Sequence, residues 1–153
     1  MYKKNRGWLW FMLVPLTWWA TTQIGYAKNV TGSMPEKHFL IRFSKNVGLG
    51  DYITFVAPNG SYYKGLNITK KVVGMYGDRV TTQNNNVYVN GKFVASAKTH
   101  SKTGEPLTVI KSGVIPKGHY FVWVNHQDSY DSRYQDIGLV NEKQIIGVSY
   151  PLW

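Results

Sequence analysis

The feature that most constrains the fold is an uncharged run near the N-terminus. From Trp8 to Ala27 the chain carries no charged residue, and a tail containing Lys3, Lys4 and Arg6 precedes the run. About 20 helical residues at 1.5 Å each span a hydrocarbon core of roughly 30 Å. Because basic residues tend to stay on the cytoplasmic side, we expect a cytoplasmic tail over residues 1–7, a transmembrane helix over 8–27 and a domain on the far side over 28–153.

A cleavable signal peptide is the alternative interpretation of the same run. Gly25-Tyr26-Ala27 ends it with small residues of the kind that cleavage sites use. The run is longer than the apolar core of a signal peptide, which is about 7–15 residues, and this favours retention as an anchor. We predict an uncleaved single-pass anchor and leave cleavage open.

Beyond Ala27 the sequence predicts one mostly β domain, because segments rich in β-branched or alternating apolar residues recur between turn residues. These segments are His38–Phe43, Tyr52–Val56, Lys70–Val73, Val87–Val94, Leu107–Ile110, Tyr120–Val124 and Gln144–Val148. Asn90-Gly91 predicts a two-residue hairpin turn, since both residues tolerate positive φ. The polar stretch from Ala95 to Pro106 predicts a surface loop.

The composition excludes several kinds of site. The chain has no Cys, so disulfides and thiolate chemistry are absent. Its four His residues, at 38, 100, 119 and 126, show no metal-binding spacing, and we predict no metal and no other cofactor. The 18 Lys and Arg residues give a formal net charge of +10 but form no basic block. This dispersed charge favours a surface near anionic lipid over nucleic-acid binding.

Two motifs after the apolar run predict a serine nucleophile with a lysine base. The first is TGSMP at 31–35, and the second is KKVVG at 70–74 followed by Gly77-Asp78. A serine hydroxyl is a weak nucleophile at neutral pH, and a neutral lysine amine can accept its proton. Each motif alone would favour an ordinary loop serine or a pair of strand-edge lysines. The prediction rests on the two motifs together.

Alternation along the second motif indicates which lysine is the base. In a strand, Ile68, Lys70 and Val72 share one face, whereas Lys71 points the opposite way. Apolar neighbours would desolvate Lys70 and lower its pKa from about 10.4. We therefore expect Lys70 to be the base and Lys71 to face solvent.

These motifs resemble those of type I signal peptidases, and most closely those of the compact TraF-type peptidases of conjugative transfer systems. The resemblance is carried by TGSMP at 31–35, by ITKKVVG at 68–74 with Gly77-Asp78, and by DSYDSRY at 128–134. It implies that Ser33 and Lys70 are catalytic and that the Thr31 hydroxyl and the Ser33 backbone N–H form an oxyanion hole. It also implies that Met34 and Pro35 position the nucleophile and line the substrate groove.

The late motif supplies the remaining predicted site residues. Ser129 is similar to the family residue that orients the lysine amine, and Asp131 and Arg133 would form a bracing ion pair. Asp131 is the better candidate for the family's third functional position, with Asp128 as the alternative. The chain departs from the housekeeping pattern at Val124–Gln127, where that branch usually has Gly-Asp-Asn.

The resemblance implies a serine endopeptidase of the bacterial inner membrane, with a compact signal peptidase-like β domain in the periplasm. Its partners would be the lipid bilayer and exported precursors, most specifically a conjugative pilin of a type IV secretion system. An acyl-enzyme could hydrolyse that pilin or transfer it to its own amino terminus and close a circle. The alternatives are a general type I signal peptidase and an inactive anchored β scaffold of a secretion apparatus. The oligomeric state is left open.

Overall fold

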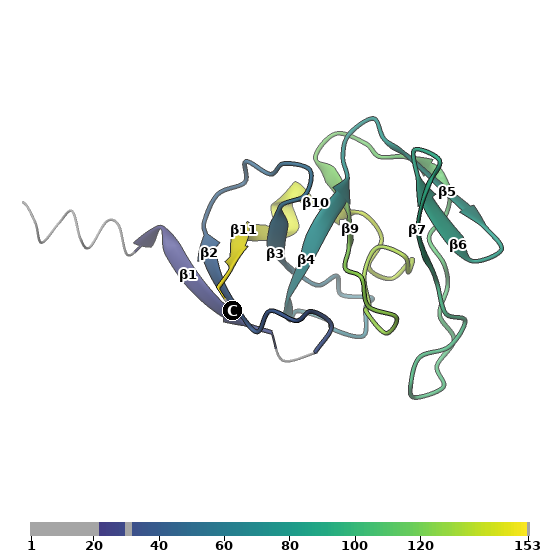
Figure 1. Cartoon of the computed structure of the whole chain (residues 1–153), viewed down its shortest axis with the longest axis horizontal. Helices are drawn as coiled ribbons and strands as arrows, with labels where there is room; N and C mark the ends of the chain where they lie inside the picture. The colour runs from purple at the N-terminus through teal and green to yellow at the C-terminus, as the bar shows by residue number, and fades with distance from the viewer. Residues whose placement is uncertain (1–21, 30–31, 153) are drawn as a thin grey trace, which may run out of the picture.

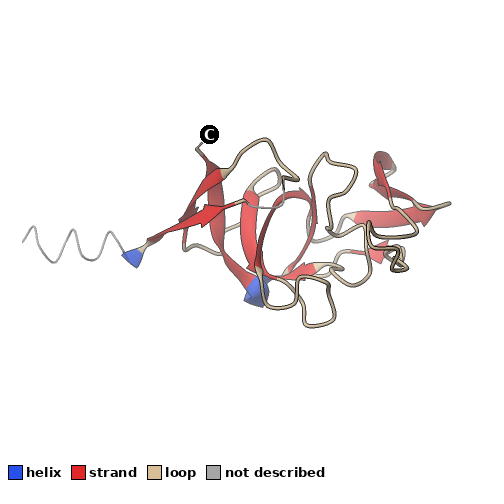
Figure 2. Cartoon of the chain, turned by 90° about the horizontal axis from the view of Figure 1, so that it is seen from below, coloured by secondary structure: helices blue, strands red, loops and turns tan. Residues whose placement is uncertain are grey.

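The computed structural model describes residues 22–29 and 32–152, which form two antiparallel β-sheets and their connecting loops (Figure 1). The strands of the larger sheet are β1 (Ile24–Lys28), β2 (His38–Arg42), β3 (Tyr52–Val56), β4 (Asn67–Gly74), β9 (His119–Trp123), β10 (Val140–Asn141) and β11 (Ile145–Pro151). Those of the smaller sheet are β5 (Arg79–Gln83), β6 (Asn86–Val89), β7 (Lys92–Ser96) and β8 (Gly113–Val114). A short 3-10 helix, η1 (Glu142–Gln144), precedes β11. The prediction of a mostly β fold is confirmed, since strands and loops make up nearly all of the described chain (Figure 2).

The larger sheet holds the strand with the two lysines near its middle. Its order is β1-β2-β11-β3-β4-β9-β10, and the smaller sheet has the order β7-β6-β5-β8. In β3, Ile53 and Phe55 are fully buried and pack in a core cluster with Val72 of β4 and Val122 of β9. Alternation in these strands therefore places every second side chain against one core.

A second core cluster lies where the smaller sheet meets the larger one. Val80 and Val87 of the smaller sheet pack there with Ile115 and with Phe121 of β9. The neighbour of Phe121, Val122, belongs to the first cluster instead. Strand β9 thus contributes to both cores and joins the smaller sheet to the body of the domain.

Two tight hairpins build the smaller sheet. Asn90 and Gly91 between β6 and β7 have φ of 50° and 76°, which confirms the predicted two-residue turn. Asn84 and Asn85 between β5 and β6 have φ of 49° and 63°, so they form a second turn of the same kind. Asn adopts positive φ more readily than most residues, which allows a hairpin without Gly.

The N-terminal boundary of the folded domain differs from the prediction. Ile24–Lys28 form β1, which pairs with β2 from Ile24↔Arg42 to Lys28↔His38. The last residues of the predicted span 8–27 are therefore part of the sheet, and the domain begins before residue 28. Within residues 22–29 and 32–152 no helix is long and apolar enough to cross a membrane. The predicted tail and the span up to residue 21 lie outside the described residues.

One predicted strand is wrong. Leu107–Ile110 makes only an isolated bridge, between Val109 and Tyr134, and belongs to no named strand. Ile110 instead packs in the second core cluster, and its backbone N–H donates to the carbonyl of Arg133 over 2.8 Å. The polar loop predicted from Ala95 to Pro106 begins two residues later than expected, because β7 extends to Ser96.

Candidate active site

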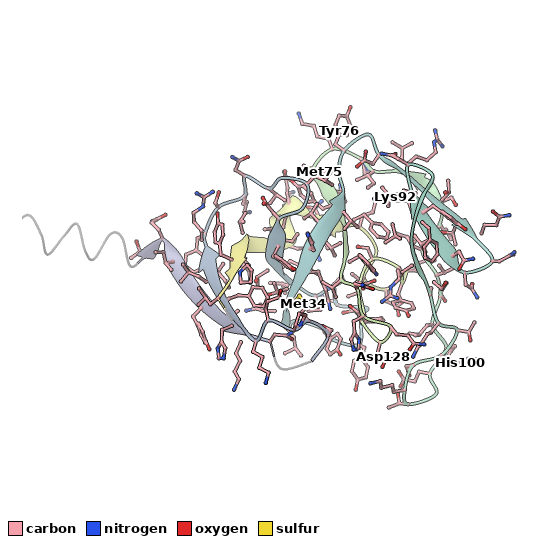
Figure 3. The ribbon with its side chains drawn as sticks, in the orientation of Figure 1. Met34, Met75, Tyr76, Lys92, His100 and Asp128 are labelled. Atoms are coloured by element: carbon pink, nitrogen blue, oxygen red, sulfur yellow. The ribbon has the colours of Figure 1, made fainter. Side chains whose placement is uncertain are left out.

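Ser33 lies in the connection between β1 and β2. The strands bring its two ends together at Lys28↔His38, and Gly32 turns the chain with a φ of +63°. The next side chain, Met34, is 7% exposed and packs in a small cluster with Phe39 and Val124. Figure 3 shows Met34 inside the molecule near the lower end of β4. Packing of Met34 therefore fixes Ser33 against the sheet.

Lys70 lies in β4, directly opposite Ile53 of β3. Its residue exposure is 3%, whereas Lys71 is exposed and holds its amine 5.8 Å from the ring centroid of Tyr52. Val72 is fully buried on the same face as Lys70, and Ile68 packs against the same core. The predicted alternation, with Lys70 inward and Lys71 outward, is confirmed.

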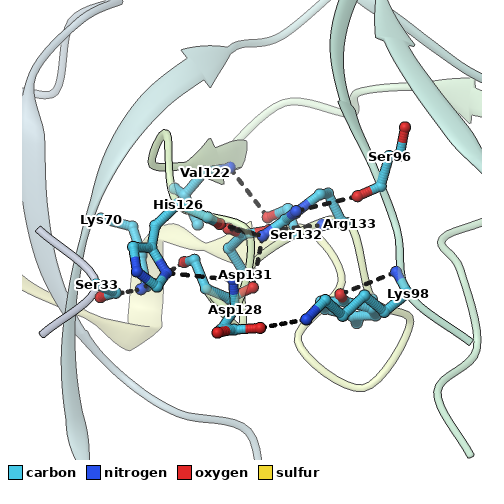
Figure 4. A network of polar contacts seen from close by, with 12 residues as sticks. Ser33, Lys70, Ser96, Lys98, Val122, His126, Asp128, Asp131, Ser132 and Arg133 are labelled. Carbon is cyan, nitrogen blue, oxygen red and sulfur yellow. Dashed lines mark hydrogen bonds and ion pairs between the residues drawn. The ribbon is translucent and has the colours of Figure 1, made fainter. Parts of the chain in front are cut away.

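The two predicted motifs meet in space. Lys70 Nζ lies 3.1 Å from Ser33 Oγ and donates to Ser129 Oγ over 2.8 Å (Figure 4). The exposures of Ser33 and Ser129 are 6% and 1%. Three chain segments, the β1–β2 connection, β4 and the loop after β9, thus place three polar groups within hydrogen-bonding distance. An amine between two hydroxyls can donate to one and exchange a proton with the other.

Burial sets the charge state of this amine. Desolvation lowers the pKa of Lys70 to about 8, the charge of Asp131 opposes this, and the charge of Arg133 adds to it. Asp131 and Arg133 form an ion pair with each other, and the effect of Asp131 on Lys70 is the larger of the two, but desolvation is the largest cause and decides the direction.

The loop after β9 is held by the buried side chain of Arg133. Its guanidinium donates to both carboxylate oxygens of Asp131, from Nε over 2.8 Å and from a terminal nitrogen over 3.1 Å. It also donates to the carbonyls of Ser96, His126 and Ser129 over 3.1, 3.2 and 2.6 Å. Asp131 and Arg133 are 0% and 2% exposed. The predicted ion pair is confirmed. Arg133 also fixes the backbone of Ser129, whose hydroxyl accepts the hydrogen bond from Lys70.

Ser132 is a residue of this loop that sequence reasoning missed. Its backbone N–H donates to the Val122 carbonyl, and its hydroxyl accepts from the Val122 N–H, both over 3.0 Å. Ser132 therefore makes with Val122 the pair of hydrogen bonds that a neighbouring strand would otherwise make, and these bonds hold the loop against β9. It is fully buried. The local signal was the hydroxyl between Asp131 and Arg133, but its partner could not be read from the sequence.

The two candidate acids lie in different environments. Asp128 is on the surface, where it pairs with Lys98 and, over 3.0 Å, with Lys102. Hydrogen bonds from these lysines hold the pKa of Asp128 at about 2. Asp131 is buried against Arg133 and acts electrostatically on Lys70. Among the hydrogen bonds of the described residues, none joins the Lys70 amine to Asp128 or to Asp131.

A groove of about 250 Å³ opens over the serine and the lysine. Its walls include Ala27 of β1, Ile68 of β4 and the aromatic rings of Tyr63 and Tyr130. The predicted groove residues are not part of this wall, because Met34 is buried against Phe39 and Val124 and Pro35 is exposed to solvent. The groove residues of β1 and β4 were missed, since the pairing of distant strands decides which side chains face it.

Thr31, the predicted oxyanion-hole hydroxyl, lies outside the described residues. Among the residues that the structure does describe, no three His, Cys, Asp or Glu side chains gather as metal ligands.

The chain matches a family model described as signal peptidase, peptidase S26, over residues 9–153. It is 33% identical over 121 residues to signal peptidase I P of Bacillus subtilis subsp. natto, covering 74% of this chain and 64% of that protein. It is 34% identical over 121 residues to signal peptidase IB of Staphylococcus aureus strain Mu50, covering 68% of this chain and 60% of that protein. The chain thus spans less than two thirds of these relatives. The crystal structure of a signal peptidase I from Enterococcus faecalis V583 is similar, with 26% identity, a TM-score of 0.43, and coverage of 67% of this chain and 96% of that one.

Proposed function

Because this chain belongs to the signal peptidase S26 family, we propose that it is a serine endopeptidase that cleaves exported polypeptide precursors through an acyl-enzyme. Ser33 is the nucleophile and Lys70 is the general base. The observation that carries this proposal is the 3.1 Å approach of Lys70 Nζ to Ser33 Oγ in a buried setting. An amine with a lowered pKa beside a hydroxyl is the arrangement that activates a serine without histidine.

The lowered pKa makes enough neutral amine available. At pH 7 a lysine with a pKa of about 8 is neutral about a tenth of the time. A lysine at its ordinary value is neutral only about four times in ten thousand. A neutral amine has two N–H donors and one lone pair. One N–H goes to Ser129 Oγ, and the lone pair accepts the Ser33 hydroxyl proton, which reverses the direction of that hydrogen bond.

The reaction then proceeds in two halves. Ser33 Oγ attacks the scissile carbonyl carbon while its proton passes to Lys70 Nζ, and collapse of the tetrahedral intermediate breaks the C–N bond. The protonated amine returns the proton to the departing amino group. Water attacks the resulting ester with Lys70 again as base. The Ser33 N–H and the Thr31 hydroxyl are the proposed oxyanion donors.

Ser129, Asp131 and Arg133 are positioning residues in this proposal. Ser129 directs the Lys70 amine through its hydroxyl, and Arg133 holds the Ser129 carbonyl over 2.6 Å. Asp131 neutralises the buried guanidinium and fixes its orientation. Asp131 rather than Asp128 is therefore the acid that supports catalysis.

We further propose a single-pass anchor that ends before Ile24 and leads into β1, with the catalytic domain on the periplasmic side of a bacterial inner membrane. The basic residues Lys3, Lys4 and Arg6 support this orientation. An anchored domain meets a membrane-embedded precursor at high effective concentration. The bilayer is thus the second partner beside the substrate.

Two substrate ranges are supported by different observations. The resemblance of the motifs to those of TraF-type enzymes supports maturation of a conjugative pilin, by hydrolysis or by transfer to the pilin's own amine. The names of the relatives, signal peptidase I P and signal peptidase IB, support a general signal peptidase instead. Growth of cells depleted of their housekeeping signal peptidase on this protein alone would establish the general role.

The experiment that tests the proposal is mass spectrometry of an exported precursor, with a candidate pilin as the first substrate. The wild-type chain and Lys71→Ala should yield matured product, whereas Ser33→Ala and Lys70→Ala should leave the precursor intact. A product one water lighter than the linear fragment indicates cyclisation. Maturation by Ser33→Ala would contradict the proposal and favour an inactive scaffold.

A further inference from the structure

A second and larger cavity lies beside the groove that contains Ser33. Its volume is about 420 Å³, and its walls come from side chains within three segments, 60–63, 98–107 and 128–136. Figure 3 shows His100 and Asp128 of these walls at the lower edge of the molecule. The residues that line both hollows are Tyr63, Lys102, Asp128 and Tyr130. The cavity therefore adjoins the groove, and a chain lying in the groove can extend toward it.

The wall of this cavity contains a row of aromatic rings. Tyr62 and Tyr63 meet edge to face with centroids 5.1 Å apart, and Tyr63 meets Tyr130 at 5.8 Å. Tyr130 stacks on Tyr134 at 5.4 Å. Tyr134 is buried, whereas Tyr62 at the other end is 68% exposed. The row thus ends in a largely exposed ring, against which a further aromatic ring can pack in the same geometry.

The charged groups of the wall are largely satisfied within it. Asp128 pairs with Lys98 and Lys102, and the Tyr130 hydroxyl donates to Asp136 over 2.8 Å. These contacts leave no concentrated charge of one sign for a phosphate or another ion. The volume is within the range of about 300–1,000 Å³ in which proteins bind organic groups. The wall fits an uncharged aromatic group with a hydrogen-bonding edge.

The cavity also contacts the candidate catalytic machinery. Ser129 lines it, and the same residue accepts a hydrogen bond from Lys70. A group bound in the cavity therefore lies against the loop that orients the base. Binding energy from such a remote part of a substrate can be used in the transition state and so raises kcat/KM.

We propose that this cavity is a second substrate subsite, which binds an aromatic side chain of the polypeptide substrate several residues from the scissile bond. The proposal rests on the proposed endopeptidase function. It identifies Tyr62 as a specificity residue outside the catalytic machinery.

The test uses the full chain in detergent micelles and synthetic peptides with an Ala-x-Ala cleavage site. One peptide is short, and the others carry an extension with a single Tyr placed about three to eight residues from the scissile bond on either side, at about 3.3 Å per residue. At the best position, Tyr should raise kcat/KM about tenfold over Ser. Tyr62→Ala should abolish most of this gain and leave cleavage of the short peptide within about twofold.

Tyr76→Ala is the matched control, because Tyr76 is 70% exposed and lies at the opposite edge of the molecule from His100 and Asp128 (Figure 3). It should keep the whole gain. A gain at no position, or a gain that survives Tyr62→Ala, would overturn the subsite while leaving the proposed function intact.

Binding is measured separately from activity. Fluorescence anisotropy with the Ser33→Ala chain should show about tenfold tighter binding of the Tyr peptide than of its Ser counterpart, and Tyr62→Ala in that background should remove the difference. Equal binding of both peptides would overturn the subsite. Absence of any cleavage by the wild-type chain would overturn the proposed function instead, and the anisotropy result would still decide on the subsite.

Discussion

Replacing Asp131 by Ala should destabilise the domain strongly, because the change leaves a buried guanidinium without its counter-charge. Arg133 is 2% exposed and loses two charge-assisted hydrogen bonds, of 2.8 and 3.1 Å. Breaking a buried pair by removing one partner costs about 3–5 kcal/mol of unfolding free energy. For a domain of this size the midpoint of thermal unfolding should fall by roughly 10 °C or more.

The assay is urea unfolding of the full chain in detergent micelles, followed by tryptophan fluorescence. Asp131→Ala/Arg133→Met should cost less than the sum of the two single changes, with a coupling of about 1–3 kcal/mol, because the double variant buries no unpaired charge. Asp128→Ala is the control, an exposed aspartate in the same loop, and should cost much less unfolding free energy than Asp131→Ala, because its ion pairs with Lys98 and Lys102 lie at the surface and are screened by solvent. A loss below about 1 kcal/mol for Asp131→Ala, or strict additivity, would refute the argument that the pair holds the loop.

Two further predictions concern the same loop. Ser132→Ala removes the acceptor of the buried Val122 N–H and should lower the unfolding free energy in urea by about 1–3 kcal/mol. Ser132→Thr keeps the hydroxyl and should lower it less. Equal losses for the two variants would contradict the role of the hydroxyl. Lys98→Ala should raise the pKa of Asp128 from about 2 toward its ordinary value in an NMR titration, because the hydrogen bond from Lys98 is the largest cause of its low value. A carboxyl whose pKa is lower in the folded state stabilises the fold at pH values above its unfolded pKa, so the stability that Asp128 contributes is lost as the pH falls from about 4 toward 2. An unchanged titration of Asp128 in Lys98→Ala would refute the pairing.

The local parts of the structure could be predicted from the sequence. Asn90-Gly91 specifies its turn through the φ angles that these residues tolerate, and the observed values of 50° and 76° agree. The inward position of Lys70 follows from the two-residue period of a strand and the apolar residues on either side of it. Both predictions depend on neighbours within a few positions.

The strand errors arose where a distant partner decides the structure. Residues 24–27 belong to the uncharged run in the sequence, but in the structure they pair with β2. Gly25 allows close approach of the Phe43 ring there, since a Cβ at this position would lie 2.8 Å from the ring. Leu107–Ile110 has the composition of a strand, yet Ile110 bonds to Arg133, which is 23 positions away in the sequence. Periodicity cannot reveal either partner.

Distant partners also decide the structure of the active site. DSYDSRY contains two aspartates, of which Asp131 is the preferred candidate for the third functional position and Asp128 the alternative. Asp128 is neutralised at the surface by Lys98 and Lys102 from another loop, and Asp131 is buried with Arg133. The guanidinium also reaches the Ser96 carbonyl at the end of β7. These contacts exist only once the smaller sheet has folded against β9, so the sequence left the choice of acid open.

The most direct test of the Ser33 and Lys70 mechanism is the pH dependence of kcat/KM on a cleavable precursor peptide. Protonation of Lys70 removes the base, so activity should rise with pH, about tenfold per pH unit, and level off above an apparent pKa of about 8. Ser129→Ala should slow the reaction but keep the rise of kcat/KM with pH, because it removes a hydrogen-bond partner of the Lys70 amine and not the amine itself. A profile that is flat from mildly acidic to alkaline pH, or one with a pKa near 6.5 that disappears in His126→Ala, would contradict the account and indicate a serine–histidine enzyme.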